Sequence, residues 1–315
     1  MDAKIKLTAS TQELLRCPIC KSKLILSDCQ FICTNAGCKA HFPIVDGIPV
    51  LINESSSLFS TDDFVNRRYT FFRPSSRIKR LMVNLLPAID CNIKAKTNYE
   101  KFSELLLKEN KNPRVLVVGC GTAGRGMQRI LSFPSIECIE SDVSFGPRTA
   151  LICDAHDIPF DSSSLDGVII QAVLEHVVDP YRCVEEIHRV LKEGGLVYAE
   201  TPFMQQVHGG KYDFTRFTRR GNRLLFRKFE EISSGAVGGP GMALAWAYRY
   251  FLLSFVKSKA ARALVGAFVR LTSFWLKYID YYLIDRPGTL DAASAYYFIG
   301  RKSNMVLSDR ELIED

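Results

Sequence analysis

Short apolar runs alternate along this chain with longer segments whose apolar residues recur at helical spacing. The runs have the length of buried strands, and the longer segments have the length of helices packed on a sheet. The predicted strands are Val115–Val118, Ile136–Glu140, a third beginning near Leu151, a fourth ending near Gln171, Leu196–Glu200, Phe229–Val237 and Ala295–Arg301. The predicted helices are 98–108, 179–191 and 219–229. This order predicts an α/β fold with a mainly parallel sheet.

Two apolar segments between the last two predicted strands do not belong to this sheet. They cover 242–256 and 264–284, and their aromatic and aliphatic residues recur at helical spacing. Both carry charges, such as Arg249 and Arg270, so neither is expected to span a membrane. We therefore predict a helical insertion at 238–290. Four roles stay open for it: a lid over a bulky apolar substrate, peripheral membrane contact through 242–284, a dimer face, or a hairpin packed on the core.

The first predicted strand runs directly into a glycine-rich turn, Gly119-Cys-Gly-Thr-Ala-Gly124. Glycines let the backbone approach a ligand closely, and ligands of open α/β sheets bind beyond the carboxyl ends of the strands. The second predicted strand delivers Glu140 and Asp142 about 20 residues further on, the spacing of a carboxylate that binds both hydroxyls of a ribose. Asp142 is preferred because it lies at the expected strand end. At this point a dinucleotide and a nucleoside-containing methyl donor fit equally well.

The residues that follow decide between these cofactors. The stretch from Ala150 to His176, which includes Cys-Asp154-Ala-His-Asp-Ile-Pro-Phe, and the stretch from Val184 to Pro202 resemble the class I S-adenosylmethionine-dependent methyltransferases of the type 11 family. The resemblance is strong over 99–203, and it implies a Rossmann-like sheet of seven strands that binds S-adenosylmethionine. The cofactor-binding residues that it implies are Gly119, Cys120 and Gly121 near the methionine part, Asp142 at the ribose, Asp154 and Ala155 at the adenine, and Gln171 on the pocket wall.

One feature departs from this family pattern. Only eight residues separate Asp142 from Leu151, whereas a crossover between parallel strands usually needs a dozen or more. We therefore expect the helix of this crossover to be missing or reduced to a turn. One face of the sheet near the adenine is then thin unless another segment covers it.

Two cysteine knuckles near the start of the chain indicate a metal site. Their spacing, Cys-Pro-Ile-Cys and Cys-Thr-Asn-Ala-Gly-Cys, suits tetrahedral zinc, and a unit this small needs a metal to be stable. The predicted ligands are Cys17, Cys20, Cys33 and Cys38, with His41 in reserve for Cys38 and Cys29 as a surplus thiol. Together with 42–51, they resemble the small zinc ribbons that accompany methyltransferases as partners or fused modules. That resemblance implies a structural or substrate-contacting role.

Composition sets the outer limits. The chain has 315 residues, of which 47% are hydrophobic and 24% charged, which is typical of a folded protein and excludes a disordered one. A net charge of +7 permits RNA or anionic lipid as a partner and requires neither. Ten cysteines without a secretory signal peptide indicate a reducing cytoplasm. The predicted domains are a zinc ribbon at 1–53, a linker and helical segment at 54–95, a methyltransferase domain at 96–305 and a tail at 306–315.

The segment after the fifth predicted strand, 201–218, leaves the carboxyl edge of the sheet, where an acceptor would meet the methyl group. His208 is the candidate catalytic base because imidazole titrates near neutrality, and Asp213 is its candidate orienter. The structural alternative is that Asp213 and its neighbours only cap the following helix. Glu175 and His176 are interpreted as pocket wall rather than metal ligands, because Ala172 stands where a further acidic ligand is expected.

These observations predict a methyltransferase acting on a small molecule, with a sugar or lipid-linked saccharide of bacterial surface-polymer assembly as the preferred acceptor. The protein is then cytoplasmic or peripheral at the inner face of the membrane. One alternative is an rRNA methyltransferase, in which the basic stretches 67–80 and 216–227 contact phosphates. The other is a non-catalytic interaction protein that retains the cofactor pocket. The oligomeric state is left open.

Overall fold

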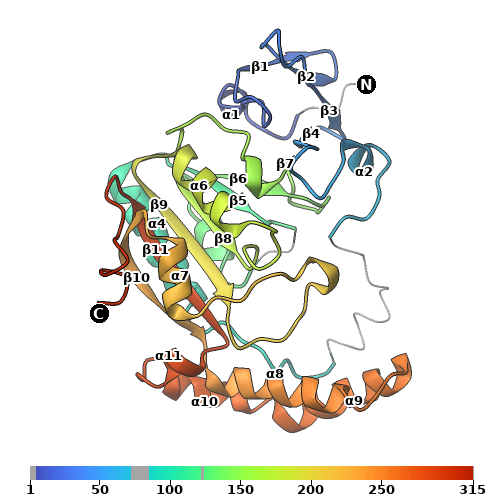
Figure 1. Cartoon of the computed structure of the whole chain (residues 1–315), viewed down its shortest axis with the longest axis vertical. Coiled ribbons are helices and arrows are strands. Elements are labelled where there is room, and N and C mark those ends of the chain that lie inside the picture. Colours follow the sequence, from blue (N-terminus) through green and yellow to red (C-terminus); the bar gives the residue numbers. More distant parts are fainter. Residues whose placement is uncertain (1–4, 72–84, 122–123, 315) are drawn as a thin grey trace.

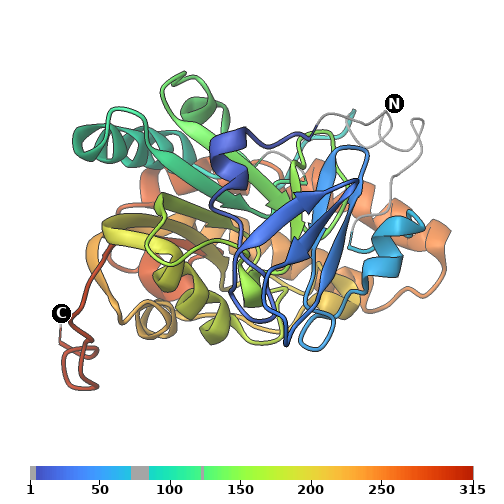
Figure 2. The same ribbon diagram turned by 90° about the horizontal axis from the view of Figure 1, so that it is seen from above.

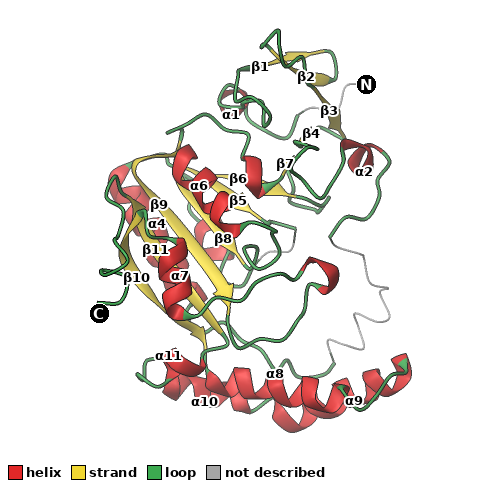
Figure 3. Ribbon diagram, viewed as in Figure 1, coloured by secondary structure: helices red, strands yellow, loops and turns green. Residues whose placement is uncertain are grey.

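A computed structural model describes residues 5–71, 85–121 and 124–314 of the chain. Its centre is a twisted sheet with helices on both faces (Figures 1 and 3). Seven strands follow the order β7-β6-β5-β8-β9-β11-β10, in which β11 is antiparallel to both neighbours and the other pairs are parallel. Their bounds are β5 (Arg114–Val118), β6 (Glu137–Asp142), β7 (Leu151–Cys153), β8 (Leu165–Gln171), β9 (Leu191–Pro202), β10 (Phe229–Gly238) and β11 (Ala295–Lys302). The α/β prediction is confirmed.

The amino-terminal unit extends this sheet. It contains α1 (Ala9–Gln12), β1 (Leu24–Ser27), β2 (Gln30–Cys33), β3 (His41–Val45), β4 (Ile48–Leu51) and α2 (Thr61–Val65). Strand β4 pairs in parallel with β7, with Val50 opposite Ile152, so the sheet has eleven strands among the described residues. The prediction of a seven-stranded sheet is therefore wrong, because the open edge of β7 is paired with another strand. Figure 2 shows β1–β4 on one side of the molecule and the carboxyl terminus on the opposite side.

Alternate residues of β5 pack into two separate cores. Val115 and Val117 face α4 (Ala95–Glu109), with Phe102 of that helix fully buried against them. Leu116 and Val118 face the side of α6 (Pro180–Val190), where Ile187 is buried. The smaller helices are α5 (Gln128–Leu131), α7 (Arg219–Leu225) and the one-turn helices η1 (Ala155–Asp157) and η2 (Gly210–Tyr212). Both faces of the central strands are thus covered, as their continuous apolar runs require.

Two boundaries differ from the sequence prediction. Helix α6 ends at Val190 and the chain passes directly into β9, so this strand begins at Leu191 and not at the predicted Leu196. Helix α7 ends at Leu225, earlier than predicted, because Phe226 and Phe229 turn into the core.

The crossover after β6 has no helix, as predicted, and residues 143–150 are bends. The amino-terminal unit covers the exposed side instead. Phe59 and Phe64 pack with Ile152 of β7 and with Phe145, whose ring centroid lies 6.0 Å from that of Phe64 in an edge-on arrangement. The short crossover and the added unit are therefore complementary.

The predicted helical insertion is confirmed between β10 and β11. It consists of α8 (Pro240–Leu253), α9 (Lys259–Ser273), α10 (Leu276–Leu283) and α11 (Thr289–Ala292), which lie along one end of the sheet in Figure 1. The buried Asp280 carboxylate accepts backbone hydrogen bonds from Gly241 and Met242, at 2.7 and 2.9 Å, and so caps the start of α8. No helix within the described ranges is long and apolar enough to cross a bilayer.

Candidate functional site

The glycine-rich turn lies at the carboxyl end of β5 and is anchored to β6. Gly119 has a φ of +81°, and its backbone N–H donates to the Ser141 carbonyl at 2.9 Å. A side chain at Gly119 would meet Val173 Cγ2 at 2.3 Å, so both the backbone angle and the space require glycine. The Gly121 N–H donates to Asp142 Oδ2 at 2.7 Å. Loop and carboxylate thus face each other, as the sequence predicted.

Asp142 is almost fully buried, with 4% of its surface exposed. Burial raises the pKa of its carboxyl group to about 6, even though three backbone N–H groups oppose that shift. Glu140, the other acid at the predicted spacing, pairs with Arg148 instead. Asp142 is therefore the carboxylate that reaches the site.

A first cavity extends from Gly119 and Asp142 towards the amino-terminal unit. Its walls include Asp154 and Ala155, as predicted, together with Phe59 and Tyr212. Asp154 Oδ1 lies 2.6 Å from His156 Nδ1, and Asp154 Oδ2 accepts from Ser57 Oγ at 2.6 Å. Burial raises the pKa of Asp154, but the hydrogen bond and charge of His156 outweigh it and hold that pKa below its ordinary value. Apart from Asp142, the walls are mainly apolar with one further carboxylate, that of Asp154, a combination that suits a purine base.

A second cavity, of about 440 Å³, adjoins the first and shares Gly119, Ala172, His176 and Phe71 with it. Gln171 lines it and donates to Glu200 Oε2 at 2.8 Å, and Asn92 donates to the same oxygen at 2.7 Å. Burial raises the pKa of Glu200. Ala172 has a φ of +54°, an uncommon value for a residue other than glycine, and such strain often occurs at functional sites.

Three side chains of this second cavity converge on one point. Glu175 is fully buried, and neither of its carboxylate oxygens has a hydrogen-bond partner among the described residues. Glu175 Oε1 lies 3.7 Å from His176 Nε2 and 3.6 Å from His208 Nε2. Burial lowers the pKa of His208, but Glu175 outweighs that effect and the net pKa is raised.

Asp213 does not contact the imidazole of His208 through a hydrogen bond. Asp213 Oδ2 lies 3.7 Å from His208 Nδ1 and instead accepts from the backbone N–H of His208, at 2.7 Å, and from Arg216 Nη2, at 3.0 Å. Burial raises the pKa of the Asp213 carboxyl group, but the hydrogen bonds and charge of Arg216 lower it by more, so the net pKa is below its ordinary value. Its orienting role therefore stays a prediction, and its observed contacts fix the loop backbone.

The four predicted zinc ligands come together in the amino-terminal unit. The Sγ atoms of Cys17, Cys20, Cys33 and Cys38 lie within 4.8 Å of one another. The Cys17–Cys38 and Cys20–Cys33 sulfur distances are 3.8 and 3.4 Å. A tetrahedral zinc with bonds of about 2.3 Å separates its sulfurs by about 3.8 Å, so the cluster has the dimensions of such a site. His41 and Cys29 are exposed and lie outside the cluster.

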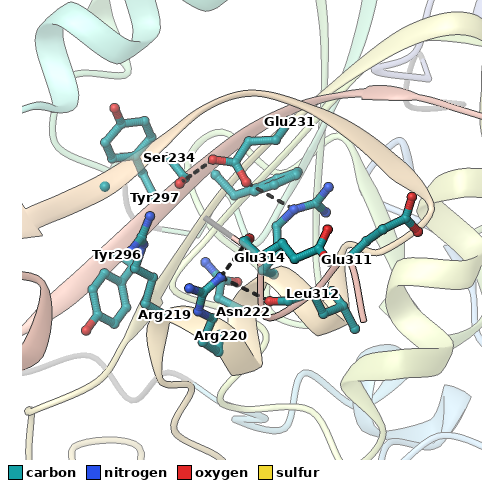
Figure 4. Close-up of a pocket in the computed structure, with 13 residues that line it drawn as sticks. Arg219, Arg220, Asn222, Glu231, Ser234, Tyr296, Tyr297, Glu311, Leu312 and Glu314 are labelled. Atoms are coloured by element: carbon teal, nitrogen blue, oxygen red, sulfur yellow. Dashed lines mark hydrogen bonds and ion pairs between the residues drawn. The ribbon is translucent and has the colours of Figure 1, made fainter. Parts of the chain in front are cut away.

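A third cavity lies apart from this site, between α7, the β10–β11 pair and the carboxyl-terminal tail (Figure 4). Figure 4 shows Glu231 beside Ser234, which donates to it at 2.6 Å, and Arg220 directed at the Leu312 carbonyl, 3.0 Å away. Arg223 pairs with Glu231 at 3.1 Å, and Arg227 binds the Leu307 carbonyl and Asp309. These arginines of the basic stretch 216–227 therefore hold the tail and the sheet edge.

Several predicted positions are not on the cavity walls. The Cys120 side chain is buried in the core beside Thr149, and burial raises its pKa to about 11. Gly121 contributes its N–H to Asp142 without lining either cavity. Two predicted segments lie partly outside the described residues. They are the glycine-rich turn, at residues 122–123, and the basic stretch 67–80, at Arg73, Arg77, Lys79 and Arg80.

Sequence reasoning missed the contributions of Ser57, Phe59, Phe71, Asn92 and Tyr212. Tyr212 ends the one-turn helix η2 and the others lie on linkers between regular elements, so no periodic pattern marks them. Only the pair Glu175-His176 gave a signal, which was interpreted as pocket wall. Its partner His208 lies in a separate segment of the chain, which is why the cluster was not recognised.

Comparison with known proteins identifies the kind of domain that the central part of the chain forms. A family model described as a methyltransferase domain matches residues 116–199. An uncharacterized methyltransferase of Mycobacterium tuberculosis is 37% identical over 90 residues, which are 26% of this chain and 37% of that protein. The chain thus spans well under half the length of this curated relative. The predicted resemblance to methyltransferases is confirmed over the matched residues.

Two further likenesses concern other features. A UPF0434 protein of Nitrosococcus oceani is 40% identical over 53 residues, which are 16% of this chain and 86% of that protein. A solved structure of Haemonchus contortus phosphoethanolamine N-methyltransferase 2 with S-adenosyl-L-methionine has a TM-score of 0.40 and 17% identity. That match covers 65% of this chain and 52% of the other.

Proposed function

One stretch of this chain belongs to the family of UPF0434 proteins, and residues 116–199 are a methyltransferase domain. From these two premises we propose a function for the protein. The protein transfers a methyl group from S-adenosylmethionine to an acceptor bound in the second cavity. The observation that carries this proposal is the pair of adjoining cavities that meet at Gly119, one lined by the buried carboxylate of Asp142 and the other by acid and imidazole groups.

The residues present fit S-adenosylmethionine better than a dinucleotide. Asp142 is placed to bind the ribose hydroxyls, Asp154 and the apolar wall around Phe59 the adenine, and Gly119 leaves room for the chain beyond the ribose. A dinucleotide needs a helix amino terminus for its pyrophosphate, and α5 has only four residues. When bound, the cofactor supplies a methyl group on a positively charged sulfur.

The chain's own groups align and activate the acceptor. The cavity walls exclude water and fix the acceptor oxygen or nitrogen in line with the methyl group, which supplies most of the catalysis in such a transfer. The cluster of Glu175, His176 and His208 is the place where the acceptor loses its proton, with His208 as its most accessible member. Asp213 holds the loop that carries His208.

For the acceptor we propose a saccharide carried on a lipid. Met242, in the first turn of α8, lies on the wall of the second cavity. At the other end of the helix, Phe251 and the following Phe255 are 62% and 73% exposed. A groove between α8 and α9 is lined by Arg249, Lys259, Arg262 and Arg270. Exposed aromatic residues beside basic ones fit the surface of an anionic bilayer. The insertion therefore brings the acceptor cavity close to membrane-bound substrates.

The RNA alternative has less support. Arg216, Arg220, Arg223 and Arg227 are all held by carboxylates or carbonyls of the chain, so they are poorly placed to bind phosphates. Zinc in the four-cysteine cluster serves the fold of the amino-terminal unit in either case.

The test is transfer of labelled methyl groups from S-adenosylmethionine by the purified, zinc-loaded protein. The substrate is an extract of a host that lacks this gene, separated into RNA, protein and lipid-glycan fractions. We expect label in the lipid-glycan fraction with wild type and none with Asp142→Ala. Label in RNA instead would overturn the acceptor class. Binding of cofactor without label in any fraction would favour a non-catalytic interaction protein.

A further inference from the structure

Glu175, His176 and His208 have features that neither a simple pocket wall nor a proton relay accounts for. A fully buried carboxylate normally accepts hydrogen bonds, because without them the charge loses its hydration and gains nothing in return. Both oxygens of Glu175 lack such a partner among the described residues. The two imidazole nitrogens beside it lie at 3.6 and 3.7 Å, beyond hydrogen-bond distance.

The tautomers of both histidines point bare nitrogens at this carboxylate. His176 Nδ1 lies 2.9 Å from the Tyr212 carbonyl, which can only accept, so Nδ1 carries a proton and, in the neutral ring that binds metals, Nε2 has the lone pair. His208 Nδ1 lies 3.2 Å from the Gln206 carbonyl, with the same consequence. Arg216 Nη2 is 3.4 Å from His208 Nδ1, but its protons go to Asp213 and to the Gln206 carbonyl, at 3.0 and 3.2 Å.

This arrangement is typical of a metal centre. Histidine ligands usually donate their second N–H to a backbone carbonyl, which fixes the ring and raises the basicity of the ligating nitrogen. The three candidate ligand atoms lie within 4.8 Å of one another. An ion with bonds of about 2.1 Å places its ligands roughly 3–3.5 Å apart, so shifts well under 1 Å would complete the site. The donor set of two imidazoles and one carboxylate suits zinc, iron and similar divalent ions.

We propose that Glu175, His176 and His208 bind a divalent transition-metal ion whose open positions face the acceptor in the second cavity. The geometry alone supports the existence of the metal site, whereas the role of the metal in catalysis rests on the proposed function. A hydroxyl group of the acceptor binds the ion and releases its proton to solvent, because a bound cation lowers the pKa of a coordinated oxygen. A lone pair of that oxygen forms the new bond to the methyl carbon, while the electrons of the broken sulfur–carbon bond remain on sulfur. His208 is then a metal ligand rather than the base itself.

The test uses cobalt as a spectroscopic probe on the full chain loaded with a single equivalent of zinc. The four thiolates bind zinc in preference to two imidazoles and a carboxylate, so the cysteines are occupied and the proposed site is left free for cobalt. We expect one equivalent of Co²⁺ to bind, with visible bands of nitrogen and oxygen ligation and without the charge-transfer band of a thiolate site. His208→Ala and Glu175→Gln should each weaken Co²⁺ binding by about 10- to 100-fold or more. His41→Ala is the matched control, because His41 is exposed on β3 and lies outside the cluster.

Two results would overturn the metal site: no Co²⁺ binding by the wild type, or equal Co²⁺ affinity in His208→Ala. Thermal melting of each variant separates loss of ligand from loss of fold. Calorimetry with S-adenosylmethionine in Glu175→Gln distinguishes this proposal from the previous one. If only the metal proposal fails, methyl transfer persists without added metal. If only the methyltransferase proposal fails, substitution of the three ligands still weakens Co²⁺ binding.

Discussion

Ser57 Oγ donates a hydrogen bond to Asp154 Oδ2 at 2.6 Å, although the two residues are 97 positions apart in the sequence. Ser57 belongs to the linker that follows β4, and Asp154 lies at the end of β7 on the wall of the first cavity. The neighbouring Leu58 and Phe59 line the same cavity. The amino-terminal unit therefore builds part of the first cavity, the proposed cofactor site, and is more than an appended module.

Removing this contact is expected to weaken cofactor binding without unfolding the protein. In Ser57→Ala, the Asp154 carboxylate keeps His156 but loses the bond that fixes its second oxygen. We expect S-adenosylmethionine affinity to fall by roughly 3- to 10-fold, which corresponds to one hydrogen bond of about 1 kcal/mol. Isothermal calorimetry measures this change. Ser55→Ala is the control, since Ser55 is exposed and its hydroxyl donates to the nearby Asn53. An equal loss in both variants would contradict the expected role of Ser57.

Asp142 is expected to bind cofactor at the expense of stability. Burial raises its pKa to about 6, so the folded state holds this proton more tightly than the unfolded chain does. Stability is then greatest below the unfolded pKa near 4 and declines as pH rises through about 6, by at most about 3 kcal/mol for a shift of two units. Asp142→Asn should therefore raise the melting temperature of the cofactor-free protein at pH 8 and change it little at pH 4.

The same variant should abolish binding of S-adenosylmethionine at both pH values, because one of the two acceptor oxygens of the carboxylate is replaced by an NH2 group that can only donate. Wild-type affinity should also fall as pH drops below about 6, where Asp142 becomes protonated. Paired melting and calorimetry across pH 4–8 check both effects. A stable variant that still bound cofactor normally would show that another carboxylate holds the ribose.

Gly119→Ala tests the close contact at the meeting point of the two cavities. The positive φ and the overlap with Val173 Cγ2 together should destabilise the protein by about 2–4 kcal/mol and remove cofactor binding. Adding Val173→Ala relieves the overlap but not the backbone strain, so it should restore part of the stability. Gly266→Ala on α9 is the control: its side chain would meet nothing within 4 Å, and helix propensity should stabilise it by about 0.5–1 kcal/mol. Urea unfolding measures all three.

The parts of the site that were predictable are those encoded by one local segment. The glycine turn follows its strand directly, and Asp142 follows at the spacing that two successive parallel strands impose, so both were found from sequence. The pairing of β4 with β7 was not, because the run of β4 was interpreted as closing the zinc unit and a sequence pattern does not identify the partner of an edge strand. The cluster of Glu175 and His208 likewise depends on a loop returning to the sheet.

Zinc removal is expected to reach the cofactor site through this strand pairing. Cys33→Ser should lose the metal and unfold β1–β3, and the linker after β4 should then no longer hold Asp154 through Ser57. Limited proteolysis should cut the amino-terminal unit, and cofactor affinity should fall at least as much as in Ser57→Ala. Cys29→Ser is the control, since this cysteine is exposed and outside the cluster. Unchanged cofactor affinity in a zinc-free, protease-sensitive Cys33→Ser protein would show that the two sites are independent.

Membrane contact through the insertion makes a prediction that separates lipid from RNA. Phe251 and Phe255 lie on exposed turns at the end of α8, and Lys259 and Arg262 follow on α9. Replacing both phenylalanines by serine should remove most binding to vesicles of anionic lipid in a sedimentation assay, since each buried ring contributes on the order of 1.5–3 kcal/mol. Lys259→Glu with Arg262→Glu should weaken binding by about 1 kcal/mol or more for each charge, and only at low salt.

Ile313→Ser removes an equally exposed apolar side chain from the tail and should have no effect, because Ile313 lies far along the chain from the insertion and outside its helices. If all these variants bound vesicles equally, or none bound more tightly to anionic than to neutral lipid, the insertion would not be a membrane-contacting surface and the case for a lipid-linked acceptor would lose its structural basis.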